Sequence, residues 1–283
     1  MQVFAEADIE ANSGKGAADE NFPVGSRLVA PALRPHIRAY YAFARAADDI
    51  ADSPDLAPAE KIRRLDAFEA VLEGRATGLA KAEALRASLA ATGISTRRAS
   101  DLLVAFRADA VTSRYASLDE LLHYCRHSAD PVGRFLLDLH GEHPSLYPAS
   151  DALSTALQIL NHLQDMGPDL ARLDRAYLPL DWLAAEGETL AAVRARRVSP
   201  GLRRVMDRLL DEVDRLLEAA GGLAGIRTRS LAGEAAAVHA LARRLSARLR
   251  RSDPLATRVE LSRADFASAL GRGLVAGLWR RAA

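Results

Sequence analysis

The stretch YYAFARAADDIAD, residues 40–52, places two aspartates on the apolar side of a helix. Apolar residues recur at helical spacing from Pro35 to Asp52, and a proline suits the first helical turn. At 100° per residue, six side chains lie within about 60° of one line along the helix: Ile37, Tyr41, Ala44, Arg45, Asp48 and Asp52. Both aspartates are therefore expected to face the core rather than solvent.

This placement of Asp48 and Asp52 is unfavourable unless a cation compensates it. Two carboxylates about 6 Å apart repel by roughly 3 kcal/mol at an effective dielectric of about 20. They also lie in the last turn before Ser53, where the helix dipole disfavours anions. Arg45 lies one turn upstream and either helps them or pairs with Asp49 at i,i+4. A hard divalent ion bound by carboxylate oxygens is the stronger explanation.

A second helix, expected over residues 150–167, repeats this pattern. Its central part has no formally charged side chain, so the helix is expected to be buried. One face of it collects Gln158, Asn161 and Asp165. A satisfied buried amide is an equally good interpretation of the asparagine. Pro168 would clash with the carbonyl four residues earlier, so the helix is expected to kink or end before Asp169.

The composition is that of a soluble globular protein, with 49% hydrophobic and 27% charged residues. A formal net charge of +1 argues against a nucleic-acid partner, which requires a basic excess. The single cysteine excludes an intrachain disulfide framework. We find no signal peptide and no membrane-spanning run, so a cytoplasmic location is expected. No pattern indicates a particular oligomeric state.

Further helical periodicities and the near absence of strand patterns predict an all-α, single-domain helical bundle. Residues 1–20 lack periodicity and are expected to form a disordered N-terminal tail, with the domain over residues 21–283. Near the C-terminus, large apolar residues recur every four positions, at Phe266, Leu270, Leu274 and Leu278. This spacing predicts a core-packing helix. Peripheral contact with the membrane surface is the alternative.

Two carboxylate clusters that face one cavity have a specific chemical use. Mg²⁺ prefers one or two carboxylates together with water and phosphate oxygens. Ions held in this way neutralise a diphosphate leaving group and allow its C–O bond to ionise. The rest of such a cavity must be apolar and dry, with aromatic faces that stabilise a carbocation.

Three segments resemble the squalene/phytoene synthase family, in the order in which that family has them. The first is Asn21-Phe-Pro together with the acidic stretch of residues 40–52. The second is YCRHSADPVG at residues 124–133. The third is QILNHLQD at residues 158–165, followed by Asp169 and by RAYLP at residues 175–179. The resemblance implies the class I isoprenoid synthase fold and Mg²⁺-dependent chemistry on an isoprenoid diphosphate. The last sixty residues or so resemble the family only weakly.

The resemblance also implies roles for individual residues. It places magnesium ligands at Asp48, Asp52, Asn161, Asp165 and Asp169. It places catalytic residues at Arg45, Tyr41 and Tyr177, and substrate contacts at Phe22, Gly133, Gln158, Gln164 and Arg175. Without the resemblance, ordinary core packing would be the default interpretation of Tyr41 and Phe22.

Two departures from the common family pattern indicate a branch. Gln164 stands where many condensing members have arginine, and Ala129-Asp-Pro-Val-Gly133 stands where many have AGTVG. Both resemble the hydroxysqualene synthases of the bacterial hopanoid pathway, which ionise presqualene diphosphate, rearrange the cation and capture water. One alternative is a head-to-head prenyl transferase making squalene, dehydrosqualene or phytoene. The alternative from another class is a non-catalytic family member that acts as an assembly factor.

Overall fold

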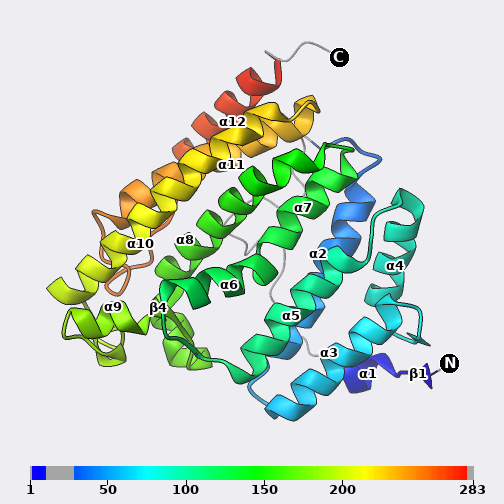
Figure 1. Ribbon diagram of the computed structural model, residues 1–283, viewed down its shortest axis with the longest axis horizontal. Helices are drawn as coiled ribbons and strands as arrows, with labels where there is room; N and C mark the ends of the chain where they lie inside the picture. The colour runs from blue at the N-terminus through cyan, green and yellow to red at the C-terminus, as the bar shows by residue number, and fades with distance from the viewer. Residues whose placement is uncertain (1, 11–28, 279–283) are drawn as a thin grey trace.

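The computed structural model describes residues 2–10 and 29–278 of the chain (Figure 1). Most of these residues are helical, which confirms the predicted all-α class. The helices are α1 (Glu6–Ile9), α2 (Arg34–Asp52), α3 (Pro58–Leu72), α4 (Ala80–Thr92), α5 (Arg97–Val111), α6 (Leu118–Ser128), α7 (Asp130–Leu139), α8 (Tyr147–Leu173), α9 (Leu180–Ala185), α10 (Pro200–Ala219), α11 (Arg229–Leu249) and α12 (Arg263–Leu278). Short 3₁₀ turns cover Pro144–Leu146, Leu190–Ala192 and Ala220–Gly225. The strands β1 (Gln2–Val3) and β2 (Ala76–Thr77) form one parallel pair, and β3 (Arg114–Tyr115) and β4 (Ala176–Pro179) form another.

Local signals explain where the helices that carry the site begin and end. Proline in the first turn opens α2, and the helix ends at Ser53 directly before a second proline. At the start of α6, the Ser117 hydroxyl accepts a hydrogen bond from the Glu120 backbone N–H. The Glu120 carboxylate in turn accepts one from the Ala116 backbone N–H at 2.7 Å, which is close to a capping box. These signals lie within a few residues of each boundary, so the sequence predicts them well.

Two hydrophobic clusters meet at α7. The first is built mainly by α2 to α5, around Phe43 and Phe68. The second is built mainly by α6 and α8 to α11, around Ile159 and Leu163. Helix α7 contributes Phe135 to the first cluster and its neighbour Leu137 to the second. In Figure 1, α7 lies between α8 on one side and α2 and α5 on the other.

Part of the predicted N-terminal tail is ordered. Of residues 1–20 the structure describes 2–10, where β1 pairs with β2 and Ile9 is buried. Gly78 makes this pairing possible, because a Cβ atom there would lie 2.0 Å from the Phe4 carbonyl oxygen. The tail prediction is therefore corrected for these residues: backbone pairing and one buried side chain, which periodicity does not reveal, order them.

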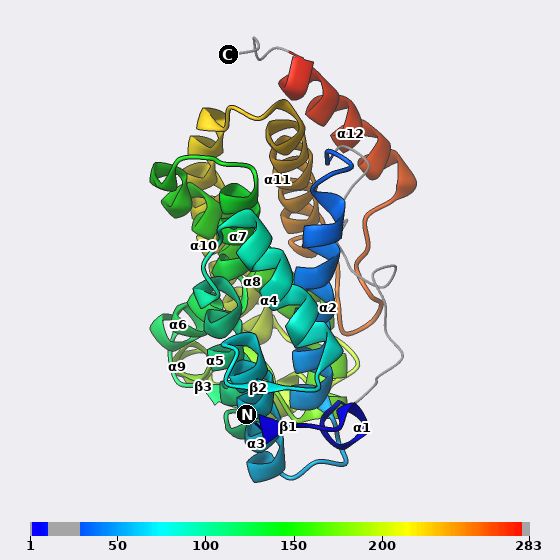
Figure 2. The ribbon, with the colours of Figure 1, turned by 90° about the vertical axis from the view of Figure 1, so that its right-hand side faces the viewer.

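The C-terminal helix differs from its predicted role. α12 packs along α11 through small residues, with Gly233 and Gly273 in close backbone contact (Figure 2). The predicted core residues instead lie on the outer face, where Phe266 is 39% and Leu278 is 75% exposed. The core-packing prediction for this stripe is wrong, because the small-residue face rather than the large apolar face meets α11. None of the described helices is both long and apolar enough to cross a membrane.

Candidate active site

The first acidic pair lies at one end of the cavity-facing side of α2. Ile37, Tyr41 and Ala44 line the cavity, and Asp48 follows on the same face, as the periodicity predicts. Arg45 pairs with two carboxylates, at 3.0 Å from Asp48 and 2.6 Å from Asp49. Arg45 therefore makes both of the contacts considered from the sequence, one with the Asp48 carboxylate and one with Asp49 at i,i+4.

The second acidic pair lies on one uninterrupted helix. Helix α8 continues through Pro168 and ends at Leu173, where Asp174 follows in the left-handed conformation. The predicted helix end before Asp169 is therefore wrong. Met166 and Leu170, on either side of the proline, are 3% and 2% exposed, so tertiary packing outweighs the lost backbone hydrogen bond. Asp165 and Asp169 consequently lie one turn apart on the same face.

The electrostatics place the two pairs close to each other. Burial and the neighbouring Asp52 carboxylate raise the pKa of Asp48 to about 8. Burial, then Asp165, then Asp52 raise the pKa of Asp169 to about 7. Asp52 on α2 therefore repels the charge of a carboxylate on α8, so the two pairs face a common space. Such an excess of buried negative charge fits a site for a divalent cation.

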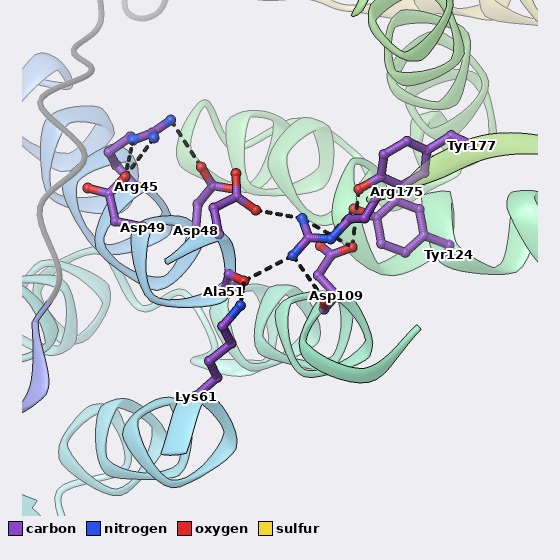
Figure 3. A network of polar contacts seen from close by, with 10 residues as sticks. Arg45, Asp48, Asp49, Ala51, Lys61, Asp109, Tyr124, Arg175 and Tyr177 are labelled. Carbon is purple, nitrogen blue, oxygen red and sulfur yellow. Dashed lines mark hydrogen bonds and ion pairs between the residues drawn. The ribbon is translucent and has the colours of Figure 1, made fainter. Parts of the chain in front are cut away.

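Arg175 ties the first acidic pair to the rest of the bundle. Its guanidinium lies 2.5 Å from Asp52 and donates to the backbone carbonyls of Ala51 and Asp109, each at 2.9 Å (Figure 3). Burial raises the pKa of the Asp109 carboxyl to about 6, although Arg175 opposes this shift. Tyr124 and Tyr177 donate to the same carboxylate at 2.9 and 3.2 Å. The network fixes Arg175, and through it the carboxylate of Asp52.

Three residues of this region escaped the sequence analysis. Asp109 interrupts the buried face of α5, which is a detectable signal for a buried polar role. Lys61 donates to the Ala51 carbonyl at 2.8 Å, and Arg258 lies 3.1 Å from Asp165. Lys61 lies on the next helix, 10 positions from its partner, and Arg258 lies 93 positions from Asp165, so no pattern within one helix identifies either contact.

Next to the acidic pairs is an apolar cavity of about 330 Å³ between α2, α7, α8 and α11. Its walls are formed by Ile37, Tyr40, Tyr41, Ala44, Ser128, Ala129, Val132, Gly133, Phe135, Leu136, Leu137, Ser150, Leu153, Ser154, Leu157, Gln158, Asn161, Leu223, Ile226, Leu231, Glu234, Ala235 and Val238. A size of this order is typical of small-molecule sites. The cavity lies where the two hydrophobic clusters meet, which suits a long hydrocarbon substrate.

The structure brings most of the predicted site residues together. Tyr41, Gly133, Gln158 and Asn161 line the cavity. The four aspartates are not among its lining residues, but Asp48 and Asp165 each follow a lining residue, Ala44 or Asn161, by one turn of the same helix. Gln164 is not in the cavity wall: it is 3% exposed and donates to the Val259 carbonyl at 2.6 Å. Tyr177 also lies outside the wall, stacked on His162 with ring centroids 3.7 Å apart. Phe22 lies outside the described residues.

Within residues 2–10 and 29–278, no group of three or more Asp, Glu, His or Cys side chains is arranged so that it could hold a metal ion by itself. The acidic residues instead come as pairs on α2 and α8. Pairs of this kind leave coordination positions for water and for a substrate's phosphate oxygens, which is how Mg²⁺ is commonly held.

Comparison with known proteins agrees with this site. The squalene/phytoene synthase family matches residues 16–265. A hydroxysqualene synthase from Rhodopseudomonas palustris is 44% identical over 91% of this chain and 88% of its own length. One from Zymomonas mobilis is 40% identical over 92% of this chain and 90% of its own. The crystal structure of a squalene synthase from Alicyclobacillus acidocaldarius superposes with a TM-score of 0.73 at 33% identity, covering 81% of this chain and 87% of that one. The chain therefore belongs to the squalene/phytoene synthase family and is an isoprenoid synthase.

Proposed function

We propose that the protein is a hydroxysqualene synthase, with its isoprenoid synthase domain over residues 21–283. It ionises presqualene diphosphate in the presence of Mg²⁺, lets the cyclopropylcarbinyl cation rearrange, and adds water to give hydroxysqualene and diphosphate. The observation that carries this proposal is the convergence of two acidic pairs at the end of an apolar cavity. The identity of 40–44% to relatives of that name supports the branch.

The residues present fit magnesium. Asp48, Asp52, Asp165 and Asp169 would hold the ions, with the Asn161 amide oxygen assisting. The raised pKa values of Asp48 and Asp169 express an unfavourable burial of negative charge, which a divalent cation would relieve. Bound magnesium supplies charge neutralisation of the diphosphate leaving group.

The protein's own groups prepare the substrate for ionisation. Arg45 and Arg258 place positive charge beside the acidic pairs, where the diphosphate would lie. Arg175 orients Asp52. The apolar walls bind the hydrocarbon and exclude bulk water, so that the cation is not quenched before it rearranges. The ring of Tyr41 offers an aromatic face to the positive charge.

Gln164 supports the branch over its nearest rival, a head-to-head prenyl transferase. A neutral amide at this position adds no positive charge, and its side chain is used to hold the Val259 backbone. An enzyme that handles one diphosphate requires fewer cationic groups than one that handles two.

Product analysis tests the proposal. Purified protein is incubated with presqualene diphosphate or with farnesyl diphosphate, each with Mg²⁺ and with a chelator. We expect hydroxysqualene from presqualene diphosphate with Mg²⁺ only. A C30 hydrocarbon from farnesyl diphosphate alone would instead identify the condensing transferase. Unchanged diphosphate release by both Asp48→Asn and Asp165→Asn would contradict the metal mechanism, and no release by the unaltered protein would favour the non-catalytic alternative.

We also propose that the enzyme is cytoplasmic and contacts the membrane surface peripherally through α12. Its exposed apolar face, with Leu274 at 49% and Leu278 at 75% exposed, lies beside Arg272. Helix α11 has one side in the cavity wall and another against α12, so a bilayer at α12 would be one helix away from the lipid-binding cavity. Flotation with anionic vesicles tests this contact. Binding should be lost in Leu274→Asp, and equal binding by this variant would refute it.

A further inference from the structure

Formation of an alcohol requires a water molecule inside a cavity whose walls are mostly apolar. A buried water is stable only where it finds two to four polar partners. Water placed at random would also quench the cation before it rearranges. If the proposed function holds, the cavity must therefore contain a defined water site next to the rearranged cation.

The cavity-facing side of α8 carries a line of polar side chains. Successive turns present Ser150, Ser154, Gln158 and Asn161, and the line continues to Asp165 at the acidic end. Ser150 is only 6% exposed. Within the described part of the chain, neither serine hydroxyl makes a hydrogen bond, and neither oxygen is among the fully buried unpaired atoms, so both are accessible from the cavity. Two unused hydroxyls therefore interrupt the apolar wall.

The two hydroxyls converge over Gly133 of α7. A Cβ atom at this glycine would lie 2.4 Å from the Ser150 Oγ and 2.6 Å from the Ser154 Oγ. The two oxygens are thus at most about 5 Å apart, and one water can bridge this distance with two hydrogen bonds of about 2.8 Å. Gly133 permits the close approach of α7, which holds both hydroxyls at the wall.

A proton acceptor is available in the same cavity. Glu234 of α11 lines it, is 9% exposed, and is the single acidic side chain among the described lining residues. The other carboxylates of the site belong to the acidic pairs on α2 and α8.

We propose that Ser150 and Ser154 hold the water that captures the carbocation, and that Glu234 accepts the proton released. The water oxygen donates a lone pair to the cationic carbon and forms the new C–O bond. One O–H bond of the resulting oxonium then breaks, its electrons stay on oxygen, and the proton passes to the Glu234 carboxylate. The diphosphate has already left with the electrons of its C–O bond, so charge and atoms balance. This assignment rests on the proposed function.

The ratio of alcohol to hydrocarbon tests the assignment, because a cation without a nearby water loses a proton instead. The double variant Ser150→Ala/Ser154→Ala, Glu234→Gln and the unaltered protein are incubated with presqualene diphosphate and Mg²⁺ in H₂¹⁸O. Alcohol and C30 hydrocarbon are then quantified per diphosphate released. Ser246→Ala is the matched control, since this buried serine lies outside the cavity and donates to Asp214. Alanine favours helices, so the serine variants are expected to fold.

We expect the alcohol fraction to fall at least tenfold in the double serine variant, to fall in Glu234→Gln, and to stay high in Ser246→Ala. An alcohol fraction in the double variant equal to that of the unaltered protein would overturn the assignment. If the unaltered protein itself releases no diphosphate from presqualene diphosphate, the proposed function fails. These two results are distinct, because the first requires labelled alcohol from the unaltered protein.

Discussion

Replacing Asp48 by asparagine should stabilise the metal-free protein while weakening its response to Mg²⁺. The carboxyl pKa is raised from 3.8 to about 8 by burial and then by Asp52, against the opposing effect of Arg45. Between these pH values the native state binds more protons than the unfolded state. The free energy of unfolding therefore falls as pH rises through this window. Asparagine removes this penalty because it cannot ionise.

The magnitude follows from the size of the shift. At about 1.4 kcal/mol per pKa unit, the full shift would correspond to a penalty of about 6 kcal/mol. Linkage fixes how this penalty depends on pH: with a native pKa of about 8, a drop of about 2 kcal/mol in the free energy of unfolding develops between pH 6 and pH 8. The asparagine variant should thus gain up to about 2 kcal/mol over the unaltered protein across this interval, an upper value because 32% of the Asp48 side chain is exposed to solvent.

Urea unfolding in EDTA at pH 6 and pH 8 measures this difference. Asp265→Asn is the control, because hydrogen bonds from Ser262 lower the pKa of that carboxyl, so its ionisation is complete well below pH 6. The stability difference caused by Asp265→Asn should therefore be the same at both pH values. With saturating Mg²⁺ the unaltered protein should recover stability at pH 8, and Asp48→Asn should recover less. A difference between Asp48→Asn and the unaltered protein that does not change from pH 6 to pH 8 would refute the reasoning.

Three further outcomes are expected. Arg175→Met should lower the free energy of unfolding by about 3–5 kcal/mol, because it leaves buried carboxylates without their partner. The control is Arg114→Met, which breaks an exposed ion pair and should lower the free energy of unfolding by less than about 1 kcal/mol in the same urea titration. Pro168→Ala should raise the melting temperature, since it restores a helical N–H inside α8, and a lower value would contradict the account of this helix. Cys125 is fully buried with a raised thiol pKa, so a thiol reagent should react only after denaturation.

The sequence was sufficient where the physical cause is local. Helical periodicity and proline positions predict α2 and its acid-bearing face, because both depend on residues within a few turns. The continuation of α8 past Pro168 has another cause. It depends on Met166 and Leu170 packing into the second hydrophobic cluster, and such packing routinely outweighs local helix preference.

Contacts between distant residues explain most of what the sequence left open. Arg175 was predicted as a substrate contact, yet its partners Asp52 and Asp109 lie 123 and 66 positions away. Gln164 was predicted in the same role, and its partner Val259 lies 95 positions away. A motif indicates which residue types a site contains. The partner of each side chain is set by the way the helices pack.

The candidate site lies near the junction of the two hydrophobic clusters, and Arg175 is one of the contacts that join them there. Each acidic pair lies on a helix that packs mainly into a different cluster: Asp48 and Asp52 lie in the last turns of α2, which packs into the first, and Asp165 and Asp169 lie in the second half of α8, which packs into the second. Neither pair alone encloses a diphosphate. Arg175 follows α8 in the chain, yet it binds Asp52 and the Ala51 carbonyl of α2. Packing of the two clusters and assembly of the proposed magnesium site are therefore coupled in part through this guanidinium, so a variant that loosens their junction should weaken magnesium binding before it unfolds either cluster.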